Sequence, residues 1–366
     1  MGSVAGEGHC PVLDQTIAAL IEEHRAVGTL REGPGPAAPQ GDGVQGTLAF
    51  PGKLAADSAT GRIAIADSGH HRVVLTDGDG VVQAVIGTGQ PGSEDGSFAA
   101  ATFRHPQGLA FGEGCLYVAD TENHLIRRAD LGASRVETVA GTGRQMHGPL
   151  RPDAGGPRAT DLNSPWDLVV WQGRLCIAMA GCHQIWALDL KREALSRVCG
   201  TGREALVDGP CLDASMNQPS GLATDGTLLY VADSEASAIR TIDPRPGGWI
   251  RTLVGVGLFE FGDRDGSGDL VRLQHPLGIA AQNGRLYIAD TYNHKLKTLF
   301  PTLGRVETLA GTGRPGVEDG ERPQFFEPGG LAAAPGRLLV ADTNNHRIRI
   351  VDLATQRVTT LPLRGL

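Results

Sequence analysis

Two histidines and one glutamate stand directly before prolines that recur along the chain. They are His105, His275 and Glu327. Imidazole and carboxylate groups are common ligands of transition metals, and a protonated imidazole attracts anions. The three residues therefore predict a ligand site, provided that the fold brings them together. The alternative is that each histidine only caps its own strand through a local hydrogen bond.

The recurring prolines define two further sets of candidate residues. The prolines are Pro51, Pro106, Pro165, Pro219, Pro276 and Pro328, and the residues directly before them are Phe50, His105, Ser164, Gln218, His275 and Glu327. Two positions after each proline stand Lys53, Gly108, Asp167, Gly221, Gly278 and Gly330. We expect the four glycines to leave room for a ligand, beside the two charged residues and an aromatic wall at Trp166.

The predicted site thus consists of Lys53, His105, Trp166, Asp167, His275 and Glu327. If the proline-led strands converge on one axis, these side chains meet at one end of a central channel, which we call the channel mouth. The ligand would be a metal, held by His105, His275 and Glu327, or an anion. No cofactor motif is present in the sequence, and we expect no cofactor.

The candidate residues belong to a repeated sequence whose most regular part is an Ala-Asp pair. The repeated aspartates are Asp67, Asp120, Asp233, Asp290 and Asp342, with Met179 at this position in the third copy. The repeated histidines are His71, His124, His183, His294 and His346. An aspartate at a strand end accepts backbone N–H bonds in an Asx turn, and an asparagine such as Asn123 tolerates positive φ. Because similar copies recur along the chain, we interpret them as structural and not catalytic.

Each repeat contains four short stretches of alternating apolar and polar residues, separated by turn residues, as expected for β-strands. Such a unit must bury its apolar faces against its neighbours, and radial repetition of four-stranded sheets forms a β-propeller. Six copies therefore predict an all-β fold, a six-bladed β-propeller over residues 47–366 with four antiparallel strands per blade. An open solenoid is the alternative. Its end repeats would need polar caps, whereas the first and last copies resemble the others.

A different pattern precedes the repeats. Apolar residues recur at three-to-four spacing between Pro11 and Gly28, which predicts a short amphipathic helix within residues 1–30. Residues 31–46 are rich in proline and glycine and predict a linker. The helix must bury its apolar face on the repeats, on a second copy of the chain or within another domain.

Glycine-rich connectors join the repeats, most clearly at residues 87–96 and 311–320. Such loops can hold phosphate groups, but here no helix follows whose N-terminus could bind them, so we do not expect a nucleotide site. We expect the connector aspartates to fix turns. They are Asp95, Asp208, Asp265 and Asp319.

Charge and cysteine usage limit the classes of partner. A net charge of −8 disfavours nucleic acid, because phosphate binding depends on clustered Lys and Arg. The sequence has no long apolar run and no signal-peptide pattern, which predicts no membrane contact and a cytoplasmic location. The six cysteines are scattered without a CxxC pair, so we expect no dithiol activity of the chain's own. Cys176, Cys182 and His183 could bind a metal, but packing is the simpler interpretation.

The strings ADTENH, ADTYNH and ADTNNH, each followed one residue later by Ile or Leu, resemble the NHL repeat family. More narrowly, NSPWDL at 163–168 and QHPLGIA at 274–280 resemble NHL propellers that follow a thioredoxin-like domain. This resemblance implies that residues 6–30 are the closing helix and linker of such a domain, most of which would be missing here. It implies the fold more directly than the function, because propellers support many unrelated chemistries.

Two classes of function remain open. The first, which we favour, is a non-catalytic scaffold that binds a protein or peptide and assists a thioredoxin-like partner or domain. The second is a metal-dependent hydrolase or lyase that uses the central channel, although no nucleophile or general base is evident beside the candidate ligands. For a scaffold, we expect the partner surface near the third repeat, where Met179 and Trp186 replace the usual residues, and on the long connectors 144–163 and 258–272. The alternative is that these connectors only pack against the repeats.

Overall fold

The computed structural model describes residues 10–30, 47–147 and 156–366. Residues 1–45 and residues 46–366 form two separate compact units. In the first unit, helix α1 (Cys10–Ala26) lies where the sequence predicted it, and Gly28 at φ +67° follows its end. The apolar side chains of Leu13, Ile17 and Leu20 are each about half exposed. No helix in the described part of the chain is long and apolar enough to cross a membrane.

The second unit is built from six antiparallel sheets, which we number as blades one to six in chain order. The inner strands are β1 (Pro51–Ala56), β6 (Pro106–Gly112), β10 (Pro165–Trp171), β15 (Pro219–Thr224), β20 (Gly278–Gln282) and β24 (Pro328–Ala334). The second strands are β2 (Ile63–Asp67), β7 (Cys115–Asp120), β11 (Arg174–Met179), β16 (Leu229–Asp233), β21 (Arg285–Asp290) and β25 (Arg337–Asp342). The third strands are β3 (Arg72–Thr76), β8 (Leu125–Asp130), β12 (Gln184–Asp189), β17 (Ala238–Ile242), β22 (Lys295–Phe300) and β26 (Arg347–Asp352).

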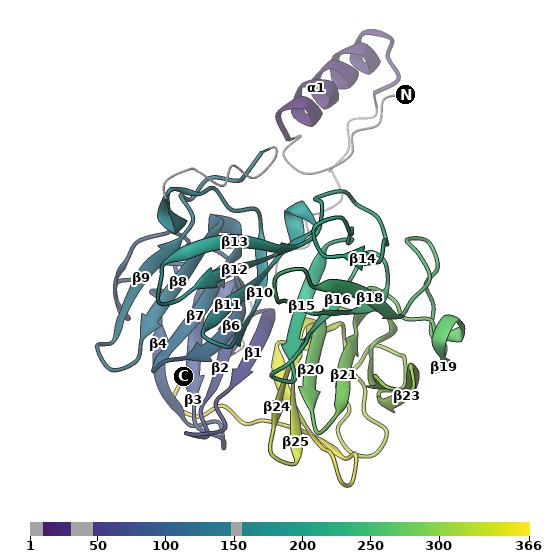
Figure 1. Ribbon diagram of the computed structural model, residues 1–366. Helices are drawn as coiled ribbons and strands as arrows, with labels where there is room; N and C mark the ends of the chain where they lie inside the picture. The colour runs from purple at the N-terminus through teal and green to yellow at the C-terminus, as the bar shows by residue number, and fades with distance from the viewer. Residues whose placement is uncertain (1–9, 31–46, 148–155) are drawn as a thin grey trace. The chain divides into compact units, whose positions relative to one another are not determined.

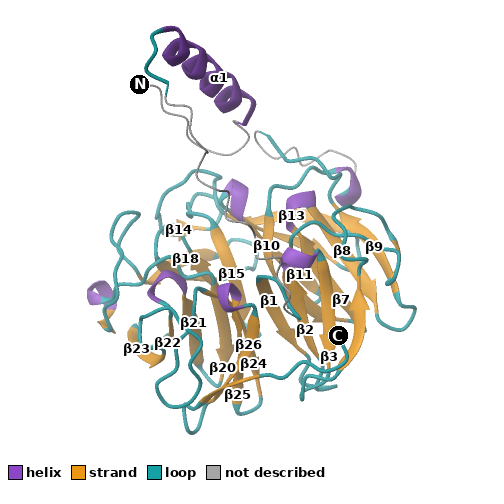
Figure 2. Cartoon of the chain, turned by 180° about the vertical axis from the view of Figure 1, so that it is seen from behind, coloured by secondary structure: helices purple, strands orange, loops and turns teal. Residues whose placement is uncertain are grey.

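The outer strands are β4 (Val82–Ile86), β9 (Arg135–Ala140), β13 (Ala194–Cys199), β18 (Trp249–Val254), β23 (Arg305–Ala310) and β27 (Val358–Thr360). The connectors add short fifth strands to blades two, four and five, namely β5 (Gly96–Ser97), β14 (Gly209–Pro210) and β19 (Gly266–Ser267). One-turn helices follow most second strands: η1 (Ser68–His70), η2 (Thr121–Asn123), η4 (Ala180–Cys182), η6 (Thr291–Asn293) and η7 (Thr343–Asn345). Two more, η3 (Pro157–Ala159) and η5 (Gly268–Leu270), lie in connectors, and Figure 2 shows these turns among the strands.

The six blades form a closed ring. Each inner strand contacts the inner strand of the next blade, and β24 of the last blade contacts β1 of the first. In Figure 1 the yellow β24 therefore lies near the purple β1. A solenoid would leave these two strands apart, so the predicted six-bladed β-propeller with four antiparallel strands per blade is confirmed.

The hydrophobic core consists of buried clusters between neighbouring blades. The cluster between blades six and one, for example, joins Ile65 and Leu54 to Leu339 and Ile348. Equivalent clusters fill the other five junctions of the ring. Burial of each such side chain contributes about 1.5–3 kcal/mol, and no blade can bury its faces alone. The apolar alternation that predicted strands is therefore also what joins the blades.

The end of the chain helps to close the ring at its outer edge. The carbonyl of Arg364 accepts a hydrogen bond from the backbone N–H of Val82 at 2.9 Å, and the N–H of Arg364 donates to Gly80 at 3.0 Å. This segment runs parallel to the outer edge of blade one, at the position where β5 lies on blade two. The last residues thus join blade six to blade one.

Glycines on the inner strands allow neighbouring backbones to touch, instead of leaving room for a ligand as the sequence suggested. A Cβ on Gly330 would lie 2.3 Å from the carbonyl oxygen of Gly52 in the next blade. A Cβ on Gly108 would lie 2.6 Å from the Cα of Asp167. The channel is therefore narrow at this level, because the inner strands approach closer than any side chain would permit.

This close approach predicts the effect of one added methyl group. Gly330→Ala should lower the free energy of unfolding by about 1–3 kcal/mol, because blades six and one must separate to fit the Cβ. The control is Gly132→Ala, where the nearest atom to the new Cβ would be 3.5 Å away and φ is not positive. Chemical denaturation of both variants measures the difference, and equal stability of the two would contradict the described packing.

Candidate functional site

The residues directly before the six prolines share an unusual backbone conformation. Phe50, His105, Ser164, Gln218, His275 and Glu327 all have positive φ, between 45° and 55°. Non-glycine residues seldom adopt this left-handed conformation, and a following proline normally favours an extended one. Each of these residues must therefore be held in place by its surroundings.

The repeated histidines hold the left-handed residues across the blade junctions. The Nδ1 atom of His71 accepts a hydrogen bond from the backbone N–H of His105 in the next blade, at 3.2 Å. Four further junctions repeat this bond at 3.0–3.2 Å, with acceptors His124, His183, His294 and His346 and donors Ser164, Gln218, Glu327 and Phe50. In blade four the hydroxyl of Ser237 takes the place of the imidazole, at 3.2 Å from the N–H of His275. Each histidine must therefore be unprotonated at Nδ1 to make its bond.

The repeated aspartates hold the same segment within each blade. Oδ1 of Asp120 accepts the backbone N–H of Arg104, two residues before the proline, at 2.8 Å. The same bond is formed by Asp67, Asp233, Asp290 and Asp342 at 2.5–2.8 Å. From the sequence, the repeated aspartates were expected to form local Asx turns, and the asparagines after them were expected to adopt positive φ. Both expectations were wrong in detail, because the aspartates bond to a distant segment and the histidines carry the positive φ.

A buried cation joins most repeated aspartates to the connectors. Arg127, which is fully buried, contacts Oδ2 of Asp120 at 2.8 Å and Oδ1 of the connector residue Asp95 at 2.8 Å. Asp95 also accepts the backbone N–H of Thr138 on the outer strand at 3.1 Å. The connector aspartates thus bind a buried cation as well as the outer strand, which the sequence analysis did not predict. Arg240, between Asp233 and Asp208, and Arg349, between Asp342 and Asp319, repeat the arrangement. In blade five the buried Lys297 contacts two connector aspartates, Asp263 and Asp265.

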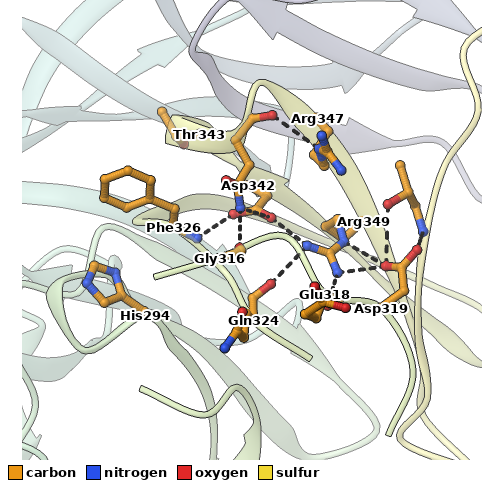
Figure 3. A network of polar contacts seen from close by, with 12 residues as sticks. His294, Gly316, Glu318, Asp319, Gln324, Phe326, Asp342, Thr343, Arg347 and Arg349 are labelled. Atoms are coloured by element: carbon orange, nitrogen blue, oxygen red, sulfur yellow. Dashed lines mark hydrogen bonds and ion pairs between the residues drawn. The ribbon is translucent and has the colours of Figure 1, made fainter. Parts of the chain in front are cut away.

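Figure 3 shows this network in blade six. Arg349 lies between Asp342, at 2.7 Å from Nη1, and Asp319, at 2.6 Å from Nη2. Its Nη1 also donates to the backbone carbonyl of Gln324 at 3.0 Å. The arginine therefore fastens the connector to the blade through several acceptors.

Burial raises the pKa values of four repeated aspartates, namely Asp120, Asp233, Asp290 and Asp342. Burial raises the pKa of Asp120 to about 6, while the N–H of Arg104, the amide of Asn123 and the guanidinium of Arg127 all favour its ionised form. These are three donors with no acceptor among them. A perturbed carboxyl group can mark an active site, but here the same environment recurs around the ring, and its cause is structural.

Blade three replaces the ionic network with apolar packing. Met179 and Trp186 stand where other blades have the aspartate and the arginine, and both side chains are fully buried. The indole N–H of Trp186 donates to Oε1 of Gln184 at 2.8 Å. These two residues belong to the core between blades two and three and offer no exposed side chain to a partner. The partner surface expected at the connectors 144–163 and 258–272 stays a prediction, and residues 148–155 lie outside the described residues.

The two versions of the junction can be exchanged to test their equivalence. Arg127→Met alone should cost about 3–5 kcal/mol, because it leaves the carboxylate of Asp120 buried without its counter-ion. Adding Asp120→Met removes that charge, as in blade three. In chemical denaturation, the loss in free energy of unfolding of the double variant should be smaller than the sum of the two single losses by at least about 1 kcal/mol. Strict additivity would mean that the two residues do not act as a pair.

A cavity of about 210 Å³ opens at the channel mouth, and Phe50, Lys53, His105 and Trp166 are among its lining residues. Lys53 is almost fully buried, and its ammonium group donates to the backbone carbonyls of Leu277 and, at 3.0 Å, of Gly329. Burial lowers the pKa of Lys53 to about 8, while the charge of Asp167 opposes this shift. Lys53 therefore joins blade one to blades five and six at the edge of the cavity.

Asp167 carries the opposite charge on blade three. Its oxygens accept the backbone N–H groups of Leu168 and of Leu222 in blade four, both at 2.8 Å. Burial raises the pKa of this carboxyl group, and the charge of Lys53 opposes the shift. Asp167 is thus also engaged in holding inner strands together, and it does not line the cavity.

The remaining candidates do not converge on a metal. The ring of His105 packs edge-on against the ring of His71, with 4.5 Å between the ring centroids. The ring of His275 stacks on that of Tyr292, with 4.6 Å between the centroids. Glu327 accepts a hydrogen bond from the amide of Asn344 at 2.8 Å. Within the described ranges, no group of three or more His, Cys, Asp or Glu side chains is arranged to hold a metal ion. The structure thus places Lys53, His105 and Trp166 at one cavity and leaves His275 and Glu327 outside its lining.

Two aromatic residues near the mouth were missed by the sequence analysis as candidates. Phe50 is 47% exposed and Tyr292 is 48% exposed, so both rings are accessible to a partner. Phe50 directly precedes a recurring proline, and Tyr292 follows a repeated aspartate at a position that varies among repeats. Their sequence signal was variation within an otherwise regular motif, which marks surface positions.

Comparison with known proteins places these repeats in a family. The family model of the NHL repeat matches residues 48–74, 103–128, 273–299 and 325–351, which contain the Asp-His motifs of blades one, two, five and six. The chain is an NHL-repeat β-propeller. The resemblance found in the sequence is therefore confirmed, and blades three and four are the copies in which the motif departs furthest from the repeat.

The NHL propeller is similar to several curated proteins. NHL repeat-containing protein 2 of Homo sapiens is 40% identical over 398 residues, covering 99% of this chain and 54% of the relative. The protein of the same name from Bos taurus is 42% identical over 354 residues, covering 86% and 48%. The chloroplastic protein SUPPRESSOR OF QUENCHING 1 of Arabidopsis thaliana is 42% identical over 394 residues, covering 100% and 37%. The chain thus spans about half the length of the first two relatives and 37% of the length of the third.

Solved structures resemble the NHL propeller at much lower identity. A virginiamycin B lyase from Staphylococcus aureus matches with a TM-score of 0.53 at 11% identity, covering 88% of this chain and 87% of that chain. A gluconolactonase from Xanthomonas campestris matches with a TM-score of 0.52 at 16% identity, covering 87% of each chain. At such identities the likeness shows the fold alone.

The histidine bonds of the NHL propeller predict sensitivity to acid. Burial lowers the pKa of His71 below its usual value, so below about pH 6.5 the unfolded chain binds more protons than the folded one. The contribution of His71 to stability is complete above this pH and decreases as the pH falls through it. His71→Ser copies Ser237 of blade four and keeps an acceptor without a titrating group.

At pH 7.5 we expect the free energy of unfolding of His71→Ser to lie within about 1 kcal/mol of that of the parent. At pH 5.5 the parent should have lost more stability than this variant has. His71→Ala, which leaves the N–H of His105 without its acceptor, should cost about 1–3 kcal/mol at pH 7.5. Denaturation curves at both pH values provide the comparison. If His71→Ser and the parent responded identically to acid, the imidazole bond would not contribute as described.

Proposed function

We propose that this protein is a non-catalytic NHL propeller that binds a segment of another protein at the channel mouth. The observation that carries the proposal is the exposure of two aromatic side chains near the channel mouth: Phe50 lines a cavity of about 210 Å³, and Tyr292 stacks on His275, the residue before the proline of blade five. Small-molecule sites usually measure about 300–1,000 Å³. A cavity of this size instead suits one or two side chains inserted from a peptide.

The charge of the mouth face indicates the chemistry of that segment. Glu122 and Glu235, half exposed, lie beside His105 and His275 at 4.0 Å and 3.7 Å, and Glu327 precedes the proline of blade six. Carboxylates steer basic groups towards a surface, and exposed aromatic rings bind arginine through their faces. We therefore expect a basic segment that also carries an aromatic or aliphatic side chain.

An enzyme is the alternative, since two propellers of similar fold are named as a lyase and a gluconolactonase. The scaffold is favoured because the charged candidate side chains already form hydrogen bonds to the backbone of neighbouring blades. Lys53 and Asp167 each hold backbone groups of other blades, and Nδ1 of His71 is bound to the backbone beside the cavity. Catalysis would require one of these groups to change partners.

The resemblance noted in the sequence suggests which partner to examine first. It implies that α1 belongs to a thioredoxin-like domain, and the half-exposed apolar residues of α1 offer a face for such a domain. We include a thioredoxin-like domain or protein among the proposed partners. For the location we keep the cytoplasm as a prediction, whereas the relative from Arabidopsis thaliana is named as chloroplastic.

A peptide-binding experiment tests the proposed function. A random peptide library selected on the full chain should yield basic sequences with an aromatic or aliphatic residue, and fluorescence anisotropy would give their affinity. Phe50→Ser and Tyr292→Ser should each weaken binding about tenfold or more, as expected for central aromatic contacts. Leu303→Ser is the matched control, because Leu303 is 65% exposed in the turn between β22 and β23, at the opposite end of β22 from Tyr292.

The proposal is contradicted if the mouth variants bind the selected peptides as tightly as the parent does. It is also contradicted if Leu303→Ser weakens binding equally, since a non-specific apolar effect would then explain both results. A library that yields no peptide above background would leave the mouth without its proposed ligand and would count against the scaffold function.

A further inference from the structure

Two cysteines that are twelve positions apart in the sequence meet between blades three and four. Cys199 ends the outer strand β13, and Cys211 directly follows the fifth strand β14. The backbone N–H of Gly200 donates to the carbonyl of Cys211 at 2.8 Å, so the two main chains run side by side. Both residues belong to the same buried cluster and are free thiols that interact with each other. This contact was not predicted, because the sequence contains no CxxC pair.

A surface cavity of about 460 Å³ reaches one of the two thiols. Its lining includes Cys211 together with Arg174, Arg197 and Arg245. Asp213 also lines it, and Arg245 is paired with the nearby Asp243 at 2.6 Å. The volume lies in the range of small-molecule sites, and the arginines outnumber the acidic groups of the lining. The cavity therefore suits a small anionic molecule, in contrast to the acidic mouth face.

We propose that Cys199 and Cys211 form a dithiol site that exchanges with an anionic low-molecular-weight disulfide bound in this cavity. The site is independent of the peptide-binding function proposed for the mouth. Its ligand class follows from the three arginines, and its reaction follows from the two thiols.

The exchange takes place in two balanced steps. The thiolate of Cys211 attacks one sulfur of the small disulfide, and the other half leaves as a thiolate that takes up a proton. Cys199 then loses its proton and attacks the sulfur of Cys211, which releases the second half as a thiol. Two protein thiols and one small disulfide thus become one protein disulfide and two small thiols, with two electrons transferred from the protein. In the reverse reaction two small thiols reduce the protein disulfide to Cys199 and Cys211 thiols and are themselves oxidised to the small disulfide.

The positions of the two sulfurs assign their roles. Cys211 lines the cavity, whereas Cys199 is fully buried, so only Cys211 can meet the ligand first. The hydrogen bond between the thiols lowers the pKa of Cys211 and raises that of Cys199, which favours the same assignment. By contrast, burial raises the pKa of Cys176 to about 12, and that thiol is not expected to react.

The test uses the full chain with glutathione disulfide, which is anionic, and cystamine, which is cationic. Peptide mapping by mass spectrometry should find a Cys199–Cys211 disulfide in the parent after either treatment. Cys199→Ser should accumulate a mixed disulfide on Cys211, and Cys211→Ser should leave Cys199 reduced. Cys115→Ser is the matched control, because Cys115 is a partly exposed free thiol in blade two, and the Cys199–Cys211 disulfide should form there as in the parent.

The charge of the cavity is tested by rate. Arg174→Gln with Arg245→Gln should slow the reaction with glutathione disulfide about tenfold at low ionic strength and should not slow the reaction with cystamine. The proposal is overturned if the parent forms no Cys199–Cys211 disulfide, if Cys115 reacts as fast as Cys211, or if both reagents respond equally to the arginine variants. Mapping of the parent decides the first point even if a cysteine variant fails to fold.

Discussion

The propeller depends on hydrogen bonds to a short backbone segment that precedes each inner strand. An aspartate of the same blade and, at most junctions, an imidazole of the preceding blade accept successive N–H groups of this segment. A hydroxyl adds a third bond, as Thr121 does by donating to the carbonyl of Pro165 in the next blade at 2.7 Å. Because the residue before each proline is left-handed and not glycine, these bonds stabilise a backbone conformation that the residue itself disfavours.

The same bonds give a structural role to residue types that are often catalytic. Asp120 is buried and its pKa is raised, but its hydrogen-bond donors are all structural. They are the backbone N–H of Arg104, the side-chain amide of Asn123 and the buried guanidinium of Arg127. The imidazole of His71 is directed at an N–H of the neighbouring blade. With these groups engaged, the surface that varies between blades is the mouth face, where Phe50 and Tyr292 are half exposed. Function is thus expected where the repeat does not determine the side chain.

Much of the fold could be predicted from the sequence, because repetition and alternation are local signals. The prolines marked the inner strands, and the Ala-Asp pairs marked the ends of the second strands. Contacts that depend on the path of the connectors could not be predicted in this way. The approach of Asp95 to Arg127 requires the connector to cross to the outer edge of the next blade, and so does the meeting of Cys199 and Cys211. The inner-strand glycines were wrongly predicted to leave room for a ligand for a similar reason. A missing side chain can leave an open space or can let a neighbouring backbone approach, and the sequence does not distinguish the two.

The central claim is that the repeated imidazoles are neutral acceptors that join the blades. It is tested most directly by NMR of the chain labelled with ¹⁵N in its histidines. The account predicts that at neutral pH His71, His124, His183, His294 and His346 carry their proton on Nε2, with an unprotonated Nδ1. It also predicts that His71 and His346 titrate below the usual range, because burial lowers their pKa. Any of the five imidazoles protonated on Nδ1, or a pKa of His71 and His346 that is not lowered, would contradict it.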